Sequence, residues 1–126
     1  MSADSVADPV GYFIEDLEFH GRTERTREAY ERVLRRFERF VDERGATPAS
    51  VDRRDCLAFV HDLRGAYAPS TVATYATYVH RFYDYMLQTE TFEGNPMALV
   101  VAEMDESIDT DPARRENELY VNDGDG

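Results

Sequence analysis

The sequence contains no lysine and only one cysteine among its 126 residues. With Cys56 alone, the chain cannot form an internal disulfide, which suits a reducing compartment. No run of residues approaches the roughly 18 apolar residues of a membrane span, and the first ten residues lack the basic and apolar regions of a signal peptide. We therefore expect a cytoplasmic protein without a membrane partner.

The missing lysine means that every cationic side chain is an arginine. There are 14 arginines against 26 aspartates and glutamates, which gives a formal net charge of −12. A flexible apolar lysine stem is poorly suited to a surface in concentrated salt. Dense carboxylates hold water and counterions there, and molar salt screens their repulsion to about 3 Å. We interpret this composition as the surface of a halophilic protein; an ordinary acidic protein that happens to lack lysine is the alternative.

Positive charge is concentrated in one stretch of the chain. Residues 22–44 hold eight of the 14 arginines and six acids, so this stretch nets +2. By contrast, residues 1–21 net −5 and residues 103–126 net −7. Such a stretch is either a surface that faces phosphates or a solvated helix whose arginines pair with neighbouring acids.

The spacing of apolar residues predicts four helices, and no strand pattern competes with them. They extend over about residues 10–20, 26–44, 52–63 and 70–89. A short apolar segment, residues 97–104, adds a last turn or helix. The expected fold is all-α, a compact bundle of four to five helices.

Helix ends are marked by capping residues and glycines. The expected N-caps are Thr26, Asp52 with Asp55 as the reciprocal acid, and Ser70. Gly21, Gly45 and Gly65 follow the first three helices, and Asn95-Pro96 is a strong stop signal. We expect a flexible acidic N-terminus over residues 1–9, a helical domain over residues 10–104, and an acidic, mobile tail over residues 105–126.

The second helix carries the first candidate binding surface. Four arginines fall on one face at 100° per residue: Arg25, Arg32, Arg36 and Arg39. Three i,i+4 pairs favour a salt-bridged, exposed helix instead: Glu28–Arg32, Arg27–Glu31 and Glu31–Arg35. A DNA-facing role needs arginines that are free of acids, and Arg22, Arg25 and Arg36 are the better candidates.

The fourth helix carries a second candidate surface, opposite its apolar side and low in carboxylates. Its members are Thr71, Thr74, Thr77, Tyr78, Arg81, Tyr85 and Gln88. Hydroxyls, an amide and one arginine can bond phosphate oxygens or base edges, and threonine methyls can contact thymine methyls. A neutral helix face, or a surface for another helix, is the alternative. Tyr75 is expected to face the core.

Catalytic and metal-binding constellations are not visible in the sequence. His20, His61 and His80 are separated and share no metal-ligand spacing with Cys56. Cys56 itself lies on an apolar helix face and is expected in the core rather than as a nucleophile. There is no glycine-rich phosphate loop. We expect no catalytic residue, no metal and no cofactor.

From Val10 to Pro96, the order of these features resembles the N-terminal core-binding domain of tyrosine recombinases, the SAM-like domain of phage integrases. Residues 23–30 resemble the family's S-x-x-T-x-x-x-Y entry to the second helix, and residues 36–40 fit its aromatic continuation. Residues 51–63 resemble the third helix. Residues 69–72 and Asn95-Pro96 fit the start of the fourth helix and the end of the domain.

The resemblance implies a helical bundle that closes over one side of duplex DNA, while a separate domain closes over the other side and cleaves the strands. The family's second and fourth helices approach the major groove. By position, this implies contacts from Arg27, Arg32, Arg35, Thr71, Thr74 and Tyr75. Because Tyr75 is also expected in the core, we prefer Thr74 and Arg81.

The predicted function is a non-catalytic DNA-binding module of site-specific recombination or DNA integration, with double-stranded DNA as its partner. The candidate DNA-binding residues are Arg22, Arg25, Arg27, Arg32, Arg35, Arg36, Thr71, Thr74, Tyr78 and Arg81. The family's catalytic arginine, lysine, histidine and tyrosine lie in the other domain, and Tyr120 lacks any matching context, so we expect no enzyme. The alternative is a protein-interaction module that pairs with a full-length recombinase or with itself and binds DNA weakly.

Overall fold

The structure, a computed structural model, describes residues 7–109 and the side chains of residues 7–104. This part of the chain forms five helices and no strand: α2 (Pro9–Phe19), α3 (Glu24–Glu43), α4 (Arg53–Arg64), α5 (Pro69–Gln88) and α6 (Ala98–Asp109). The predicted all-α bundle is therefore confirmed. Of the predicted terminal segments, residues 1–6 and 110–126 lie outside the described part. None of the described helices is long and apolar enough to cross a bilayer.

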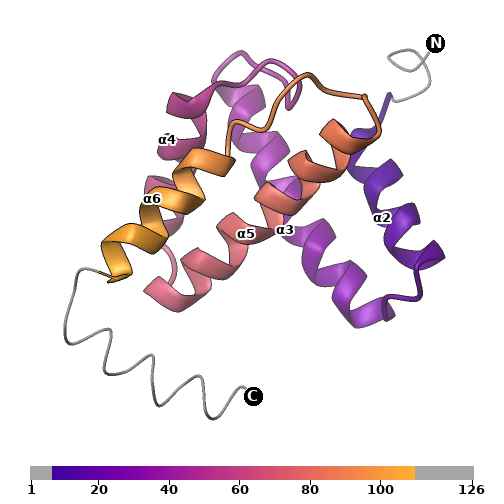
Figure 1. The fold of residues 1–126 in the computed structure, drawn as a ribbon, viewed down its shortest axis with the longest axis horizontal. Helices are drawn as coiled ribbons and strands as arrows, with labels where there is room; N and C mark the ends of the chain where they lie inside the picture. Colours follow the sequence, from indigo (N-terminus) through magenta and orange to yellow (C-terminus); the bar gives the residue numbers. More distant parts are fainter. Residues whose placement is uncertain (1–6, 110–126) are drawn as a thin grey trace.

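The two long helices, α3 and α5, cross at the centre of the molecule (Figure 1). The helix α2 packs against both of them on one side, and α4 and α6 pack against α5 on the other. The amino-terminal ends of α3 and α5 diverge from the crossing toward the lower edge of Figure 1. The loops that follow their carboxyl ends, residues 44–52 and 89–97, lie at the opposite edge. We call these the lower and the upper edge.

The core is built from the apolar faces that the sequence predicts. Phe37 of α3 is fully buried at its centre, with edge-to-face contacts to Phe59 and Tyr83 at centroid distances of 5.0 and 5.9 Å. Cys56 is also fully buried, and burial raises the pKa of its thiol to about 12. Its burial confirms the prediction that Cys56 is a core residue. Because the thiolate is the reactive form of cysteine, the raised pKa also makes this thiol a poor nucleophile.

Two of the expected N-caps are wrong. The cap of α3 is Thr23, whose Oγ1 accepts a hydrogen bond from the Thr26 backbone N–H at 3.1 Å, so the helix begins at Glu24 rather than near Thr26. The cap of α5 is Ala68, which has no side-chain bond to offer; Pro69 starts the helix with its fixed φ. Ser70 is therefore already inside the helix.

The other helix ends follow the sequence prediction. Asp52 and Asp55 form a reciprocal capping box at the start of α4. Gly21 and Gly45 have φ of +83° and +80°, a conformation that glycine adopts without steric cost. Beyond these glycines, the chain closes Schellman-type bonds back to α2 and α3. These turns fix the direction in which the chain leaves each helix.

Acid should weaken the fold through two capping carboxylates. A hydrogen bond from Arg35 holds the pKa of Asp8 below its ordinary value of 3.8, and the backbone N–H of Asp52, helped by Arg44, does so for Asp55. Because both pKa values are lowered in the folded state, their contribution is complete above about pH 4 and is lost as pH falls through the folded values. Urea unfolding at pH 6 and pH 2.5 should show this loss. The double variant Asp8→Asn, Asp55→Asn should show a smaller pH dependence; an unchanged dependence would contradict the assignment.

Candidate nucleic-acid interface

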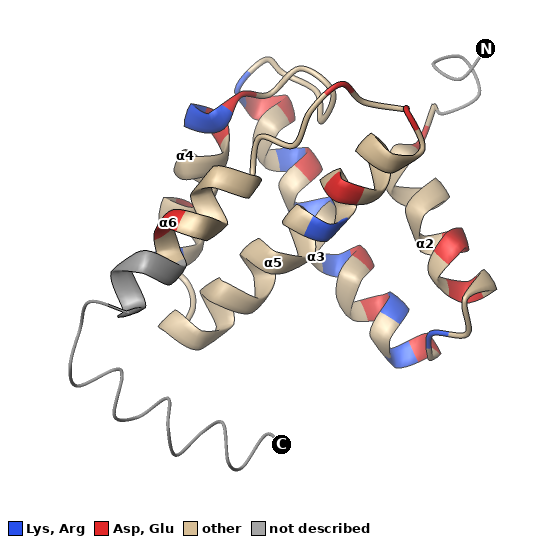
Figure 2. Cartoon of the chain, viewed as in Figure 1, with Lys and Arg blue, Asp and Glu red and all other residues tan. Residues whose placement is uncertain are grey.

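The lower edge combines two helices of different charge character. Figure 2 shows α5 without any charged residue from its start until Arg81. The amino-terminal half of α3 instead alternates arginines and acids along its length. Whether this edge can bind a phosphate backbone depends on which arginines of α3 already form ion pairs within the protein.

Arg35 is held by three carboxylates. Its guanidinium contacts Asp8 at 2.8 Å, Glu38 at 2.9 Å and Glu31 at 3.3 Å. These hydrogen bonds raise the pKa of Arg35 above its ordinary value, and the bond to Asp8 has the largest effect. Since Asp8 caps α2, Arg35 ties the start of α2 to α3. A phosphate would have to displace these carboxylates to reach it.

Arg36 is also paired, although the sequence places no acid near it. It bonds Asp62 of α4 at 3.0 Å and the Tyr67 hydroxyl at 3.1 Å, and its guanidinium carbon lies 5.2 Å from the Tyr67 ring centroid. The hydrogen bond that Arg36 donates to Asp62 raises the pKa of Arg36. The expectation that Arg36 is free of acids is therefore wrong. Asp62 lies 26 residues away in the sequence, beyond the reach of an i,i+4 argument.

Arg27 lies between α2 and α3 and is largely covered. Its Nη1 is 3.8 Å from Glu18, and its buried Nε has no hydrogen-bond partner. Of the three expected i,i+4 ion pairs, the Glu31–Arg35 pair forms. The pairs Glu28–Arg32 and Arg27–Glu31 do not come within 4.0 Å. The second helix is thus less internally neutralised than its sequence indicates.

Of the candidate arginines in or next to α3, three have no ion pair within the described part of the chain: Arg22, Arg25 and Arg32. All three are exposed, and they lie just before α3 or in its amino-terminal half. Arg32 follows Arg25 by seven positions, which places both on one face of the helix. Glu28 lies one turn from each and is exposed as well. Arg25 and Arg32 therefore place unpaired positive charge toward the lower edge, whereas Arg39, which is also exposed and has no ion pair among the described residues, lies near the other end of α3.

The surface predicted for α5 is divided by the fold. Thr74 is exposed and Thr71 is half-buried near the lower edge. The Thr74 hydroxyl donates to the Ser70 carbonyl at 3.1 Å, so its hydrogen is already used and its oxygen can still accept a hydrogen bond. Tyr85, expected on the same surface, instead packs on Phe13 and Tyr12 of α2 at 5.3 and 5.9 Å between centroids. That prediction is wrong because α2 covers the carboxyl-terminal half of α5.

Four tyrosines form a contiguous cluster between α3 and α5: Tyr67, Tyr75, Tyr78 and Tyr30. Successive ring centroids are 5.1, 6.2 and 4.0 Å apart, and the last pair is stacked with an interplanar angle of 18°. Tyr75 and Tyr78 are half-buried, so Tyr75 borders the core rather than filling it. In the sequence, the i,i+3 spacing of Tyr75 and Tyr78 is the only sign of this cluster, because the other two members come from distant positions.

The tyrosine cluster also positions two arginines. The Tyr30 hydroxyl accepts a hydrogen bond from Arg81 at 2.9 Å, and the Tyr67 hydroxyl accepts the bond from Arg36. Arg81 is otherwise exposed and lies next to Tyr78 on the outside of the crossing. The structure therefore brings Tyr78 and Arg81 together at the junction of the two helices, between the free arginines of α3 and the threonines of α5.

The family to which the chain belongs follows from comparison with known proteins. Residues 11–93 match the family model of the phage integrase N-terminal SAM-like domain, so the chain belongs to this family, as its motifs predict. Over 90 residues, the chain is 31% identical to the tyrosine recombinase XerD of Shewanella oneidensis. This match covers 70% of the chain but 30% of the length of that relative. No solved structure matches the chain.

Proposed function

We propose that this chain is a non-catalytic, duplex-DNA-binding module of site-specific recombination or DNA integration, with residues 10–104 as the binding domain. One observation carries the proposal. Three exposed arginines without ion pairs in the described chain, Arg22, Arg25 and Arg32, lie at the same edge as the uncharged, threonine-bearing start of α5. Family membership supports it, because the similar relative is a tyrosine recombinase.

In the proposed complex, the two helices have different tasks. The arginines of α3 contact phosphates, which positions the module without reading sequence. Thr71 and Thr74 of α5 offer hydroxyl oxygens and methyl groups to base edges in the major groove. Arg81 and Tyr78 occupy the junction between the helices. Arg27, Arg35 and Arg36 support the fold and reach DNA only by exchanging their present partners.

Strand cleavage lies outside this proposal. The matched region is the N-terminal domain of the family, and the matched part of the recombinase relative is 30% of its length. We propose that a different domain or a partner protein supplies the catalytic groups. The acidic, lysine-free composition fits a module that works in concentrated salt, where counterion release contributes little and hydrogen bonds contribute more.

A salt titration of DNA binding tests the function. Fluorescence anisotropy with a labelled 20-base-pair duplex should give an association constant that falls as KCl rises from 50 mM to 2 M. Three phosphate contacts predict a slope of about −2.7 in a plot of log K against log salt, from about −0.9 for each phosphate. A slope near zero, or no binding at 50 mM KCl, would contradict the proposal.

The second candidate function is an interaction module that pairs with a full-length recombinase. The capture of Arg27, Arg35 and Arg36 by protein groups favours it, because fewer cations are left for phosphates. Light scattering on a mixture with a full-length tyrosine recombinase, without DNA, separates the two functions. A stable complex, together with no duplex binding in the titration above, would establish the second.

A further inference from the structure

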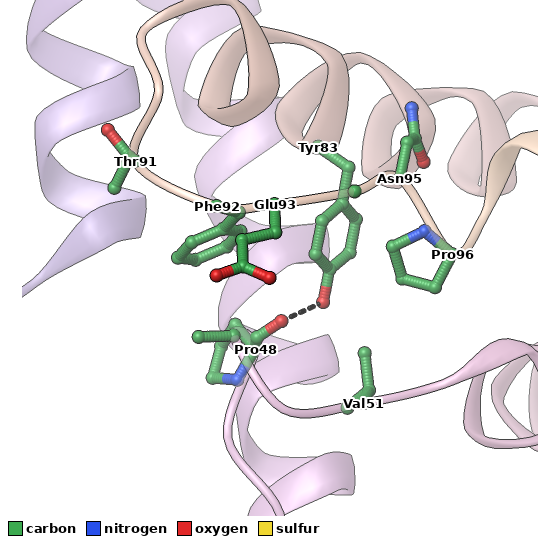
Figure 3. A pocket seen from close by; sticks show the side chains of 10 residues that line it. Pro48, Val51, Tyr83, Thr91, Phe92, Glu93, Asn95 and Pro96 are labelled. Atoms are coloured by element: carbon green, nitrogen blue, oxygen red, sulfur yellow. Dashed lines mark hydrogen bonds between the residues drawn. The ribbon is translucent and has the colours of Figure 1, made fainter.

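A groove runs along the upper edge, on the side away from the candidate DNA surface. Three hollows of about 590, 340 and 320 Å³ adjoin one another, and Pro48 lines all three. The first and second hollows share Phe92, and the second and third share Glu38. The groove therefore follows the turn after α3 and reaches the loop after α5. Figure 3 shows the first hollow.

Apolar side chains form part of the floor of this groove, and hydrogen bonding holds its shape. Tyr83 of α5 is almost fully buried, and its hydroxyl donates a hydrogen bond to the Pro48 carbonyl across the first hollow (Figure 3). Phe92 packs against the Tyr83 ring at a centroid distance of 5.7 Å. Val51 and Pro96 complete the apolar walls. Because the turn is bonded to α5, the groove exists before any partner arrives.

Carboxylates are spaced along the rim of the groove. Glu93 is exposed over the first hollow, and Figure 3 shows its side chain beside Phe92. At the far end, Glu38 and Asp42 line the third hollow. Arg39 is the one cationic residue among those that line the three hollows. Neither Glu93 nor Asp42 forms an ion pair within the described residues, so both carboxylates are available to cations from outside.

We propose that this groove binds an extended basic segment of a protein partner. An apolar side chain of the segment fits between Pro48 and Phe92, and a lysine or arginine places its stem on the apolar wall and its cation at Glu93. A second cation meets Asp42. Charge complementarity selects the occupant: a groove with an apolar floor and carboxylate rims favours a segment that alternates apolar and basic residues. The site lies opposite the candidate DNA surface, so one molecule can hold both partners.

A peptide titration tests the groove. The probe is a labelled, end-blocked octapeptide of alternating arginine and leucine, followed by fluorescence anisotropy in 50 mM KCl. Saturable binding is expected, with affinity about fivefold lower for Glu93→Gln, since an ionised acceptor makes the stronger hydrogen bond. The matched control is Glu15→Gln, which removes an exposed carboxylate of α2 outside the groove and should change nothing. Equal weakening by both variants would show diffuse charge attraction and overturn the site.

Two further readouts complete the test. In a ¹⁵N-edited NMR titration, the shifted amides should fall in residues 47–51 and 91–96; shifts confined to other segments would overturn the proposal. A peptide with glutamine in place of arginine should bind several-fold more weakly, and equal binding would also overturn it. Replacing Arg22, Arg25 and Arg32 should leave peptide binding intact. A failure of the groove is thus separable from a failure of the DNA surface.

Discussion

Replacing Arg22, Arg25 and Arg32 together with alanine should weaken duplex-DNA binding by about 500-fold at 0.1 M salt. Each phosphate contact contributes roughly an eightfold factor at this concentration, from the release of about 0.9 counterion. These three arginines are exposed and have no ion pair in the described chain, so their removal leaves no carboxylate unpaired there. Anisotropy titrations should also show the salt slope reduced by about 2.7.

A charge-matched triple variant provides the control. Arg44, Arg53 and Arg54 lie at the end of α3 and the start of α4, away from the lower edge. Replacing them with alanine removes the same total charge and should leave the salt slope within about 0.5 of the parent. If the two triple variants lose affinity equally, binding depends on net charge alone, and the proposed surface is wrong.

Replacing Phe37 with alanine should cost about 3–5 kcal/mol of folding free energy. Phe37 is fully buried, and its ring contacts Phe59 of α4 and Tyr83 of α5. Its removal therefore opens a cavity where three helices meet, which adds to the lost transfer free energy. Because a domain of this size has a total free energy of unfolding of only about 5–15 kcal/mol, this substitution should remove a large part of it. Urea unfolding followed by circular dichroism measures the change.

The chain offers a matched control for this substitution. Phe19, at the end of α2, is 84% exposed, so Phe19→Ala makes the same chemical change without a cavity and should alter stability by less than about 0.5 kcal/mol. If Phe37→Ala leaves no folded protein, Phe37→Leu provides a milder variant that should still destabilise by more than about 1 kcal/mol. A smaller loss from Phe37→Leu would place the centre of the core elsewhere.

The helices could be predicted from the sequence because their signals are local. Apolar spacing and the glycines after α2 and α3 depend on residues within a few turns of each other. The start of α3 is predicted too late because Thr23 and Thr26 both have capping chemistry, and only the backbone geometry shows that Thr23 is the cap. The prediction of Ser70 as the cap of α5 is wrong because Ser70 has the chemistry of a cap, whereas Pro69 takes the first helical position.

The candidate site depends on pairings between distant segments, and the sequence predicts these poorly. The partner of Arg36 comes from α4, and that of Arg35 precedes α2. Helical spacing indicates which arginines share a face but not which acids other helices bring to them. For the same reason, Tyr30 could not be connected with Tyr78 or Arg81, which lie 48 and 51 residues further along the chain.

The contrast between the arginines of α3 and the uncharged start of α5 has a consequence for the timing of binding. Long-range attraction between arginines and phosphates mainly raises the rate of encounter, whereas short-range contacts mainly determine how long a complex lasts. In the proposed complex, the arginines of α3 therefore mainly determine the association rate constant, and Thr71 and Thr74 mainly determine the dissociation rate constant. Rising salt should lower the association rate constant steeply and change the dissociation rate constant less. At high salt, such a module would therefore associate slowly with DNA but dissociate slowly from a site to which it is bound.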